Sequence, residues 1–262
     1  MSIKTNKMLF VTSIALIGLI FGIIAGCGSK NVKPVADPDD QLKIAMKLYE
    51  KEKYYEAETE FQKFIYNYPG NKAVDTAQYY LGMSYYKDGD YALAAGEFKK
   101  FLTSFPASDF ADDAQYHLAM SHYHQSPGYE LDQSETRLAI DEFLNFLDGY
   151  PLSEHADSAS VKLTEMRNKL AKKTFKTGRL YQKLNQFDPA ILYYNRLITE
   201  YPESPYVEES VFRKGECYLK LEKDIKAREA FLEYLNRFEN GKYHGDVVDH
   251  LRDLEDKPKA EL

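Results

Sequence analysis

The chain has 262 residues, of which 44% are apolar and 14% aromatic, with 22 Tyr, no Trp and two Cys. This composition excludes a disordered chain, which would be poorer in aromatic residues, a polytopic membrane protein, which would be far more apolar, and a disulfide-stapled miniprotein. The formal net charge of -7 argues against general nucleic-acid binding, because neutralising phosphates requires a basic surface.

The N-terminal segment has the pattern of a secretory signal. Lys4 and Lys7 precede an uncharged apolar run over residues 8–26, with small residues where cleavage would fall. Residues 24–27, IAGC, resemble the bacterial lipobox, in which the Cys becomes the first mature residue. We therefore expect a lipoprotein signal peptide over residues 1–26 and a covalent N-acyl diacylglycerol with palmitate on Cys27. The alternative is a retained transmembrane helix, because a run of this length can span a bilayer.

Residues 27–40 are predicted to form a lipid-anchored tether, since they contain Gly28, two prolines and no apolar periodicity. With Cys27 lipidated, Cys217 has no intrachain partner. Its helical surroundings favour a buried small apolar side chain over a reactive thiol.

The rest of the chain repeats one helical pattern five times. Four copies end in an aromatic residue and a proline, at Pro69, Pro106, Pro151 and Pro202, and a fifth has Glu239 in place of the proline. Each copy has alanine twelve positions before this point, an aromatic residue eight before, and an aromatic residue or leucine five before, which is one face of a helix. These positions are Ala57, Phe61 and Phe64; Ala94, Phe98 and Phe101; Ala139, Phe143 and Phe146; Ala190, Tyr194 and Leu197; and Ala227, Phe231 and Tyr234.

Another helical pattern precedes each copy and supplies a small residue where a second helix must approach closely. The small residues are Ala45, Gly82, Ala119, Gly178 and Gly215. In the second copy, Gly82, Tyr85, Ala94, Phe98 and Pro106 resemble the tetratricopeptide (TPR) consensus except for its Trp. The sequence therefore predicts an all-α fold, a superhelical array of five TPR helix pairs.

The predicted TPR domain covers residues 41–255. Its units are residues 41–70, 71–107, 108–152, 153–203 and 204–240, with a capping helix over 243–254 and a flexible tail over 256–262. Asn71, Ser108, Ser153 and Ser204 are predicted to cap the first helix of the following pair. A loop is expected over residues 125–133, and additional residues without a helix breaker predict one long helix over residues 154–184.

The order and number of these features resemble the BamD family, which are lipoprotein subunits of the outer-membrane β-barrel assembly (BAM) machine. The resemblance covers essentially the whole mature chain and implies a non-catalytic protein on the periplasmic face of the outer membrane. Its implied partners are the POTRA-bearing barrel subunit BamA, held chiefly by the C-terminal repeats, and other assembly lipoproteins. The N-terminal repeats would bind the targeting strands of unfolded outer-membrane proteins.

A different interpretation is a periplasmic TPR adaptor of the cell envelope, such as the protein that coordinates the Tol-Pal system with cell-wall synthesis. That family generally lacks a lipobox and has a coiled-coil segment before its repeats, and neither description fits this sequence. No enzyme, cofactor or metal is expected. His117, His122 and His124 do not share a helical face, and the sequence has no Walker loop, dinucleotide-binding fingerprint or nucleophile elbow.

A stripe rich in Met and Tyr follows the first helices of the first three pairs, about 100° from the face that packs on the second helix. Met adapts its shape and Tyr combines apolar area with a hydroxyl, which suits a groove that binds many extended peptides. The alternative is that these side chains fill contacts between successive repeats. The stripe consists of Leu42, Met46, Tyr49, Tyr79, Met83, Tyr86, Tyr116, Met120 and Tyr123.

Seven basic residues and no acidic one lie between residues 167 and 183 of the predicted long helix. One interpretation is a solvated helix face. The other is an electrostatic dock for an acidic partner surface, such as a POTRA domain or anionic headgroups. The residues are Arg167, Lys169, Lys172, Lys173, Lys176, Arg179 and Lys183.

Overall fold

The computed structural model describes residues 37–256, so the predicted signal peptide, Cys27 and most of the tether lie outside the described residues. The described part of the chain is helical throughout its regular structure. The pairs are α2 (Pro38–Glu50) with α3 (Tyr54–Asn67), α4 (Val74–Asp88) with α5 (Tyr91–Ser104), α6 (Ala111–Gln125) with α7 (Ser134–Gly149), α8 (Ala156–Lys183) with α9 (Phe187–Glu200), and α10 (Val207–Lys220) with α11 (Asp224–Arg237). A last helix, α12 (His244–Asp256), packs on α11.

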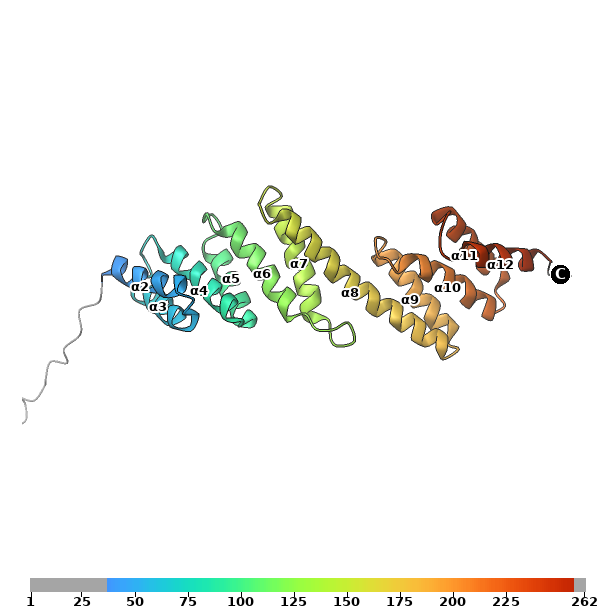
Figure 1. The fold of residues 1–262 in the computed structure, drawn as a ribbon, viewed down its shortest axis with the longest axis horizontal. Coiled ribbons are helices and arrows are strands. Elements are labelled where there is room, and N and C mark those ends of the chain that lie inside the picture. Colours follow the sequence, from blue (N-terminus) through green and yellow to red (C-terminus); the bar gives the residue numbers. More distant parts are fainter. Residues whose placement is uncertain (1–36, 257–262) are drawn as a thin grey trace, which may run out of the picture.

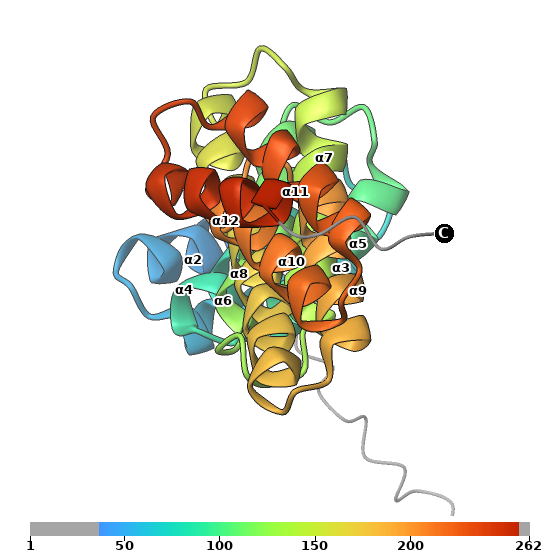
Figure 2. The same ribbon diagram turned by 90° about the vertical axis from the view of Figure 1, so that its right-hand side faces the viewer.

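Each helix packs on its neighbour in the sequence, so the pairs follow one another along an elongated array (Figure 1). Seen along the long axis, the pairs lie at different angles around it (Figure 2). The all-α superhelical TPR array predicted from the sequence is therefore confirmed.

Close contact between a small residue and an aromatic ring holds each pair together. The small first-helix residue is fully buried at Ala45 and Ala119, and the facing ring is fully buried at Phe61 and Phe143. In α4, a Cβ built on Gly82 would lie 2.8 Å from Cε1 of Phe98. The helices approach so closely here that an added methyl group would have to displace the ring.

Four of the five pairs share one turn between their helices. One residue of the turn has positive φ, at Glu52 (60°), Gly89 (92°), Asn185 (57°) and Glu222 (55°). The N–H of the next residue donates to a carbonyl five positions earlier, as from Lys53 to Leu48. This is the bonding of a Schellman ending, which satisfies carbonyls that a helix end leaves free. In the third pair, residues 126–133 form a loop in its place.

The prediction that Asn71, Ser108, Ser153 and Ser204 cap the following helices is wrong. The helices begin three residues later, at N-cap residues Ala73, Phe110, His155 and Tyr206. Each side chain instead accepts a hydrogen bond from the N–H two residues on, which closes a turn between the pairs. The hydroxyls of Ser108 and Ser153 also donate to Asp75 and Asp112, at the start of the preceding first helix.

The 28-residue helix α8 joins two hydrophobic cores. Met166 and Leu170 in its first half pack with α6 and α7. Phe175, little more than one turn further, packs with α9 and α10. The array therefore consists of two stacks of helix pairs that share one continuous helix.

The closest helix contact predicts a measurable asymmetry between two glycines. A Cβ on Gly215 would lie closer to the ring of Phe231 than the Cβ on Gly82 would lie to Phe98, whereas exposed Gly96 in α5 has no atom within 4 Å of its Cβ position. We expect Gly215→Ala to lower the free energy of unfolding by about 1–3 kcal/mol through overpacking. Gly96→Ala should raise it by about 0.5–1 kcal/mol. Urea titrations followed by circular dichroism measure both, and equal effects would contradict the proposed packing.

Candidate protein-binding surfaces

The Met and Tyr stripe lies between successive first helices, and part of it is buried. Tyr79, Met83 and Met120 are only 6%, 7% and 9% exposed, so they cannot line an open groove in this structure. Burial arises because α4 approaches α2 and α6 on this face, a long-range contact that the periodicity of one helix does not reveal. The half-buried members of the stripe are Leu42, Met46, Tyr49, Tyr86, Tyr116 and Tyr123.

Two of the half-buried tyrosines reach the next first helix. The Tyr86 hydroxyl lies 3.0 Å from Nε2 of His124, and the Tyr123 hydroxyl donates to Glu165 at 2.7 Å. Burial raises the pKa of Tyr86 to about 12 and lowers the pKa of His124. At neutral pH the phenol therefore donates and the neutral imidazole accepts. This part of the stripe joins α4, α6 and α8.

Three of the basic residues in α8 hold the loop between α6 and α7. Their Nζ atoms contact the Ser126 hydroxyl at 2.7 Å from Lys169, the Tyr129 ring at 4.4 Å from Lys172, and the Leu131 carbonyl at 2.6 Å from Lys173. Burial lowers the pKa of Lys169. Sequence analysis missed this role, because the partners of Lys169 lie 43 positions away and no local pattern joins them.

The other basic residues of α8 differ in their exposure and pairing. Arg167 forms an ion pair with Glu203, and Arg179 pairs with Glu209 at 2.8 Å. Lys176 and Lys183 are exposed, and neither forms an ion pair or hydrogen bond with another described residue. A hollow of about 230 Å³ is lined by Lys176, Arg179, Leu180 and Lys183. Only this end of the basic segment is free to meet a partner.

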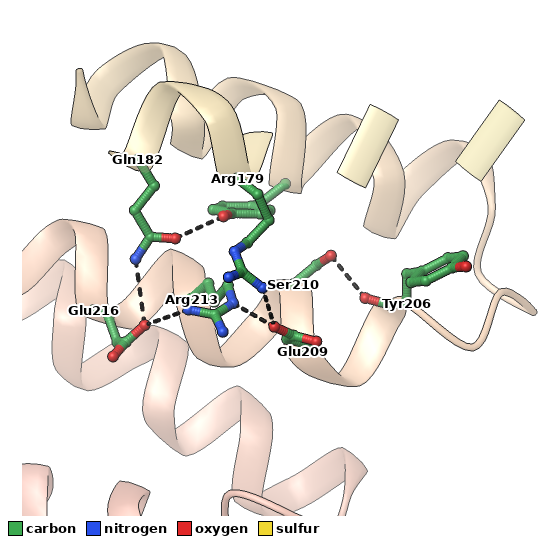
Figure 3. Close-up of polar contacts among 8 residues, drawn as sticks. Arg179, Gln182, Tyr206, Glu209, Ser210, Arg213 and Glu216 are labelled. Atoms are coloured by element: carbon green, nitrogen blue, oxygen red, sulfur yellow. Dashed lines mark hydrogen bonds and ion pairs between the residues drawn. The ribbon is translucent and has the colours of Figure 1, made fainter. Parts of the chain in front are cut away.

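A polar network joins α8 to α10 (Figure 3). The carboxylate of Glu209 accepts from both Arg179 and Arg213. Gln182 donates to Glu216 at 3.3 Å, and Arg213 contacts the same oxygen at 3.4 Å. On the equivalent helix faces, the first three pairs therefore present aromatic side chains, whereas the fourth and fifth pairs present a network of charges.

One further cluster lies where α6 meets the start of α8. The ligand atoms of Asp113, Glu154 and His155 lie within 4.8 Å of one another and could hold a cation. His155 Nε2 already lies 2.8 Å from Asp113 Oδ1, and its ring stacks on Tyr116 with centroids 4.3 Å apart. These contacts account for the position of His155 as a link between the third pair and α8. Sequence analysis did not connect these residues, which are 42 positions apart.

The lone described cysteine is not a reactive site. Cys217 is fully buried in α10, and burial raises the pKa of its thiol to about 12. Because the thiolate is the reactive form, this thiol is inert at neutral pH. The prediction of a buried small apolar side chain is confirmed. None of the helices within residues 37–256 combines the length and the apolar character that crossing a membrane requires.

Stacked helix pairs with exposed faces on both stacks define a TPR scaffold, a class of protein that binds other proteins. The family profile of YfiO, described as an outer membrane lipoprotein, matches residues 36–234. The chain belongs to this family of outer membrane lipoproteins. A comparison with curated proteins gave no significant match.

Solved structures with a similar arrangement are TPR proteins of low sequence identity. The TPR2AB domain of yeast Sti1 in its pHSP90 complex is 12% identical, with 83% of this chain and 90% of that chain covered and a TM-score of 0.41. A thermophilic TPR protein from Thermus thermophilus is 15% identical, with 84% and 99% covered and a TM-score of 0.36. MamA from Desulfovibrio magneticus RS-1 is 15% identical, with 84% and 97% covered and a TM-score of 0.35.

The network between α8 and α10 predicts a stability difference between two carboxylates. Glu209 and its two arginines have side chains that are 19–32% exposed, whereas the ion pair of Arg196 with Glu200 is 51% and 43% exposed. We expect Glu209→Gln to lower the free energy of unfolding by about 1–2 kcal/mol, because it leaves Arg179 and Arg213 without their shared anion. The matched variant Glu200→Gln should cost less than about 0.5 kcal/mol. Chemical denaturation measures both, and a similar cost for the two variants would refute the role of the network.

Proposed function

We propose that this outer membrane lipoprotein is a non-catalytic subunit of the β-barrel assembly machinery. In this role it binds a BamA-like, POTRA-bearing barrel subunit together with other assembly lipoproteins, and it promotes the folding and insertion of outer-membrane proteins. The observation that carries the proposal is the family match over residues 36–234, which extends from the start of the described array into α11.

The proposed anchor is a lipid on Cys27 at the periplasmic face of the outer membrane. The lipobox-like residues 24–27 support it, and only nine residues separate Cys27 from Asp37, the first described residue. More than one acyl chain on the cysteine would provide stable anchoring, where a single chain would be marginal. The anchor would keep the first helix pair near the membrane surface.

The proposed site for the targeting strands of unfolded barrel proteins is the exposed part of the Met and Tyr stripe. Met46 and Tyr49 in α2, with Tyr86, Tyr116 and Tyr123 on the next first helices, remain half-exposed. Side chains that combine apolar area with a hydroxyl can contact many different extended peptides. The buried Tyr79, Met83 and Met120 would support this surface from beneath rather than contact the peptide.

The proposed contact with the POTRA-bearing subunit lies in the C-terminal stack. Lys176 and Lys183 are exposed cations in a chain of net charge -7, so they would attract an acidic partner surface. Their positions are distinct from those of Lys169, Lys172 and Lys173, whose contacts hold the loop.

The test is mass spectrometry of proteins that co-purify with the full-length lipoprotein, tagged at its C-terminus and extracted from cell envelopes in detergent. We expect stoichiometric recovery of a large POTRA-containing barrel. Recovery of Tol-Pal or wall-synthesis proteins without that barrel would contradict the proposed function and favour an envelope adaptor. As a control for anchoring, Cys27→Ser should move the protein from the membrane fraction to the soluble fraction.

A further inference from the structure

Each first helix that follows another pair uses one face to stack on the preceding second helix. Relative to the small residue that meets the aromatic ring, the positions five before and two after belong to this face. In pairs two, three and five they are small and fully buried, at Ala77 and Ser84, Ala114 and Ser121, and Ser210 and Cys217. In α2, which has no preceding helix among the described residues, the equivalent Asp40 and Lys47 are exposed.

Helix α8 carries this stacking face twice. In its first half, Ala159 and Met166 have the same spacing and are 0% and 3% exposed against the third pair. In its second half, Gly178 meets Tyr194 of α9, so the equivalent positions are Lys173 and Leu180. Figure 1 shows this half of α8 extending past α6 and α7 toward α9. The preceding second helix that would cover it is therefore missing.

The uncovered face has the surface of an unfilled stacking site. Leu180 is 55% exposed where three other pairs have a fully buried residue, and Leu184, one turn further, is 56% exposed. The loop over residues 126–131 limits the face at one end, because Lys173 donates to the carbonyl of Leu131. From residue 173 to residue 184 the face is about 16 Å long, or three helical turns.

The charges around this face are of one sign. Two hollows, of about 230 and 170 Å³, are lined by six basic residues and no acidic one. These residues are Arg137, Lys173, Lys176, Arg179, Lys183 and Arg196. The parts of the chain outside the described residues have more basic than acidic side chains, so they offer no complementary segment. A complementary occupant must come from another molecule and carry negative charge.

We propose that an acidic amphipathic α-helix of a partner protein docks on α8 between residues 173 and 184, in the place of the missing second helix. Its apolar side chains would cover Leu180 and Leu184, and its carboxylates would meet Lys176 and Lys183. The inference rests on the proposed function, because it names the element through which an assembly partner would bind the C-terminal stack. A helix is favoured over a flat lipid surface because the open face is one that α4, α6 and α10 cover with a helix.

The test is site-specific photocrosslinking in cells that produce the full-length lipoprotein. Benzoylphenylalanine replaces Leu180 or Leu184 in two variants, and Leu192 of α9, which is 67% exposed, in a control variant. We expect adducts at the first two positions only, each with a peptide of another protein that has apolar residues at helical spacing and an excess of Asp and Glu. Adding Lys176→Glu and Lys183→Glu should reduce the adduct yield about fivefold or more. All substituted side chains are exposed, and circular dichroism checks that the fold is retained.

The proposal is overturned by equal adducts at Leu192, by adducts with phospholipid, with a second copy of this chain or with a peptide lacking acidic residues, or by a yield that charge reversal leaves unchanged. Co-purification separates this outcome from failure of the proposed function. Recovery of the POTRA-bearing barrel without the helix adduct would refute only the docking site. A helix adduct from an unrelated envelope protein, without that barrel, would refute the proposed function and leave the docking site standing.

Discussion

The close contact between a small residue and an aromatic ring within each helix pair determines the rest of this architecture. Where Gly178 or Gly215 meets the ring of the next helix, there is no space for a methyl group, so the crossing point of the two helices is fixed. With that point fixed, the face of the first helix that meets the preceding pair is fixed as well. Small buried residues such as Ser84 and Ser121 let the next pair approach, and the array grows by repetition.

The same constraint explains why α8 is both a joint and an exposed surface. Its added turns separate the face that stacks on the third pair from the glycine that receives α9. Met166 completes the first stack and Phe175 begins the second, while Leu180 occupies a stacking position with nothing on it. The interruption also separates two kinds of surface. Tyrosines join the first helices of the N-terminal stack, and an ion network around Glu209 joins those of the C-terminal stack.

Local spacing made the fold predictable, and long-range contacts limited the prediction of the sites. The positions of Gly82 and Phe98 follow from helical periodicity within one pair, which is why the pairs could be counted from the sequence. Ser108 was misassigned as a helix cap because a turn and a cap require the same side chain two residues apart. Tyr79 was placed in a groove because no local pattern shows that the next first helix covers it.

Hydrogen–deuterium exchange of the full-length protein, alone and with its co-purified partners, tests the central claim that partner binding occurs where helix stacking is interrupted. In the free protein, amides over residues 173–184 should exchange faster than the equivalent amides over residues 210–221, because only the latter are covered by a preceding helix. With partners bound, exchange over residues 173–184 should slow while exchange over residues 159–166 stays unchanged. Equal rates in the free protein, or no change over residues 173–184 on binding, would contradict the account.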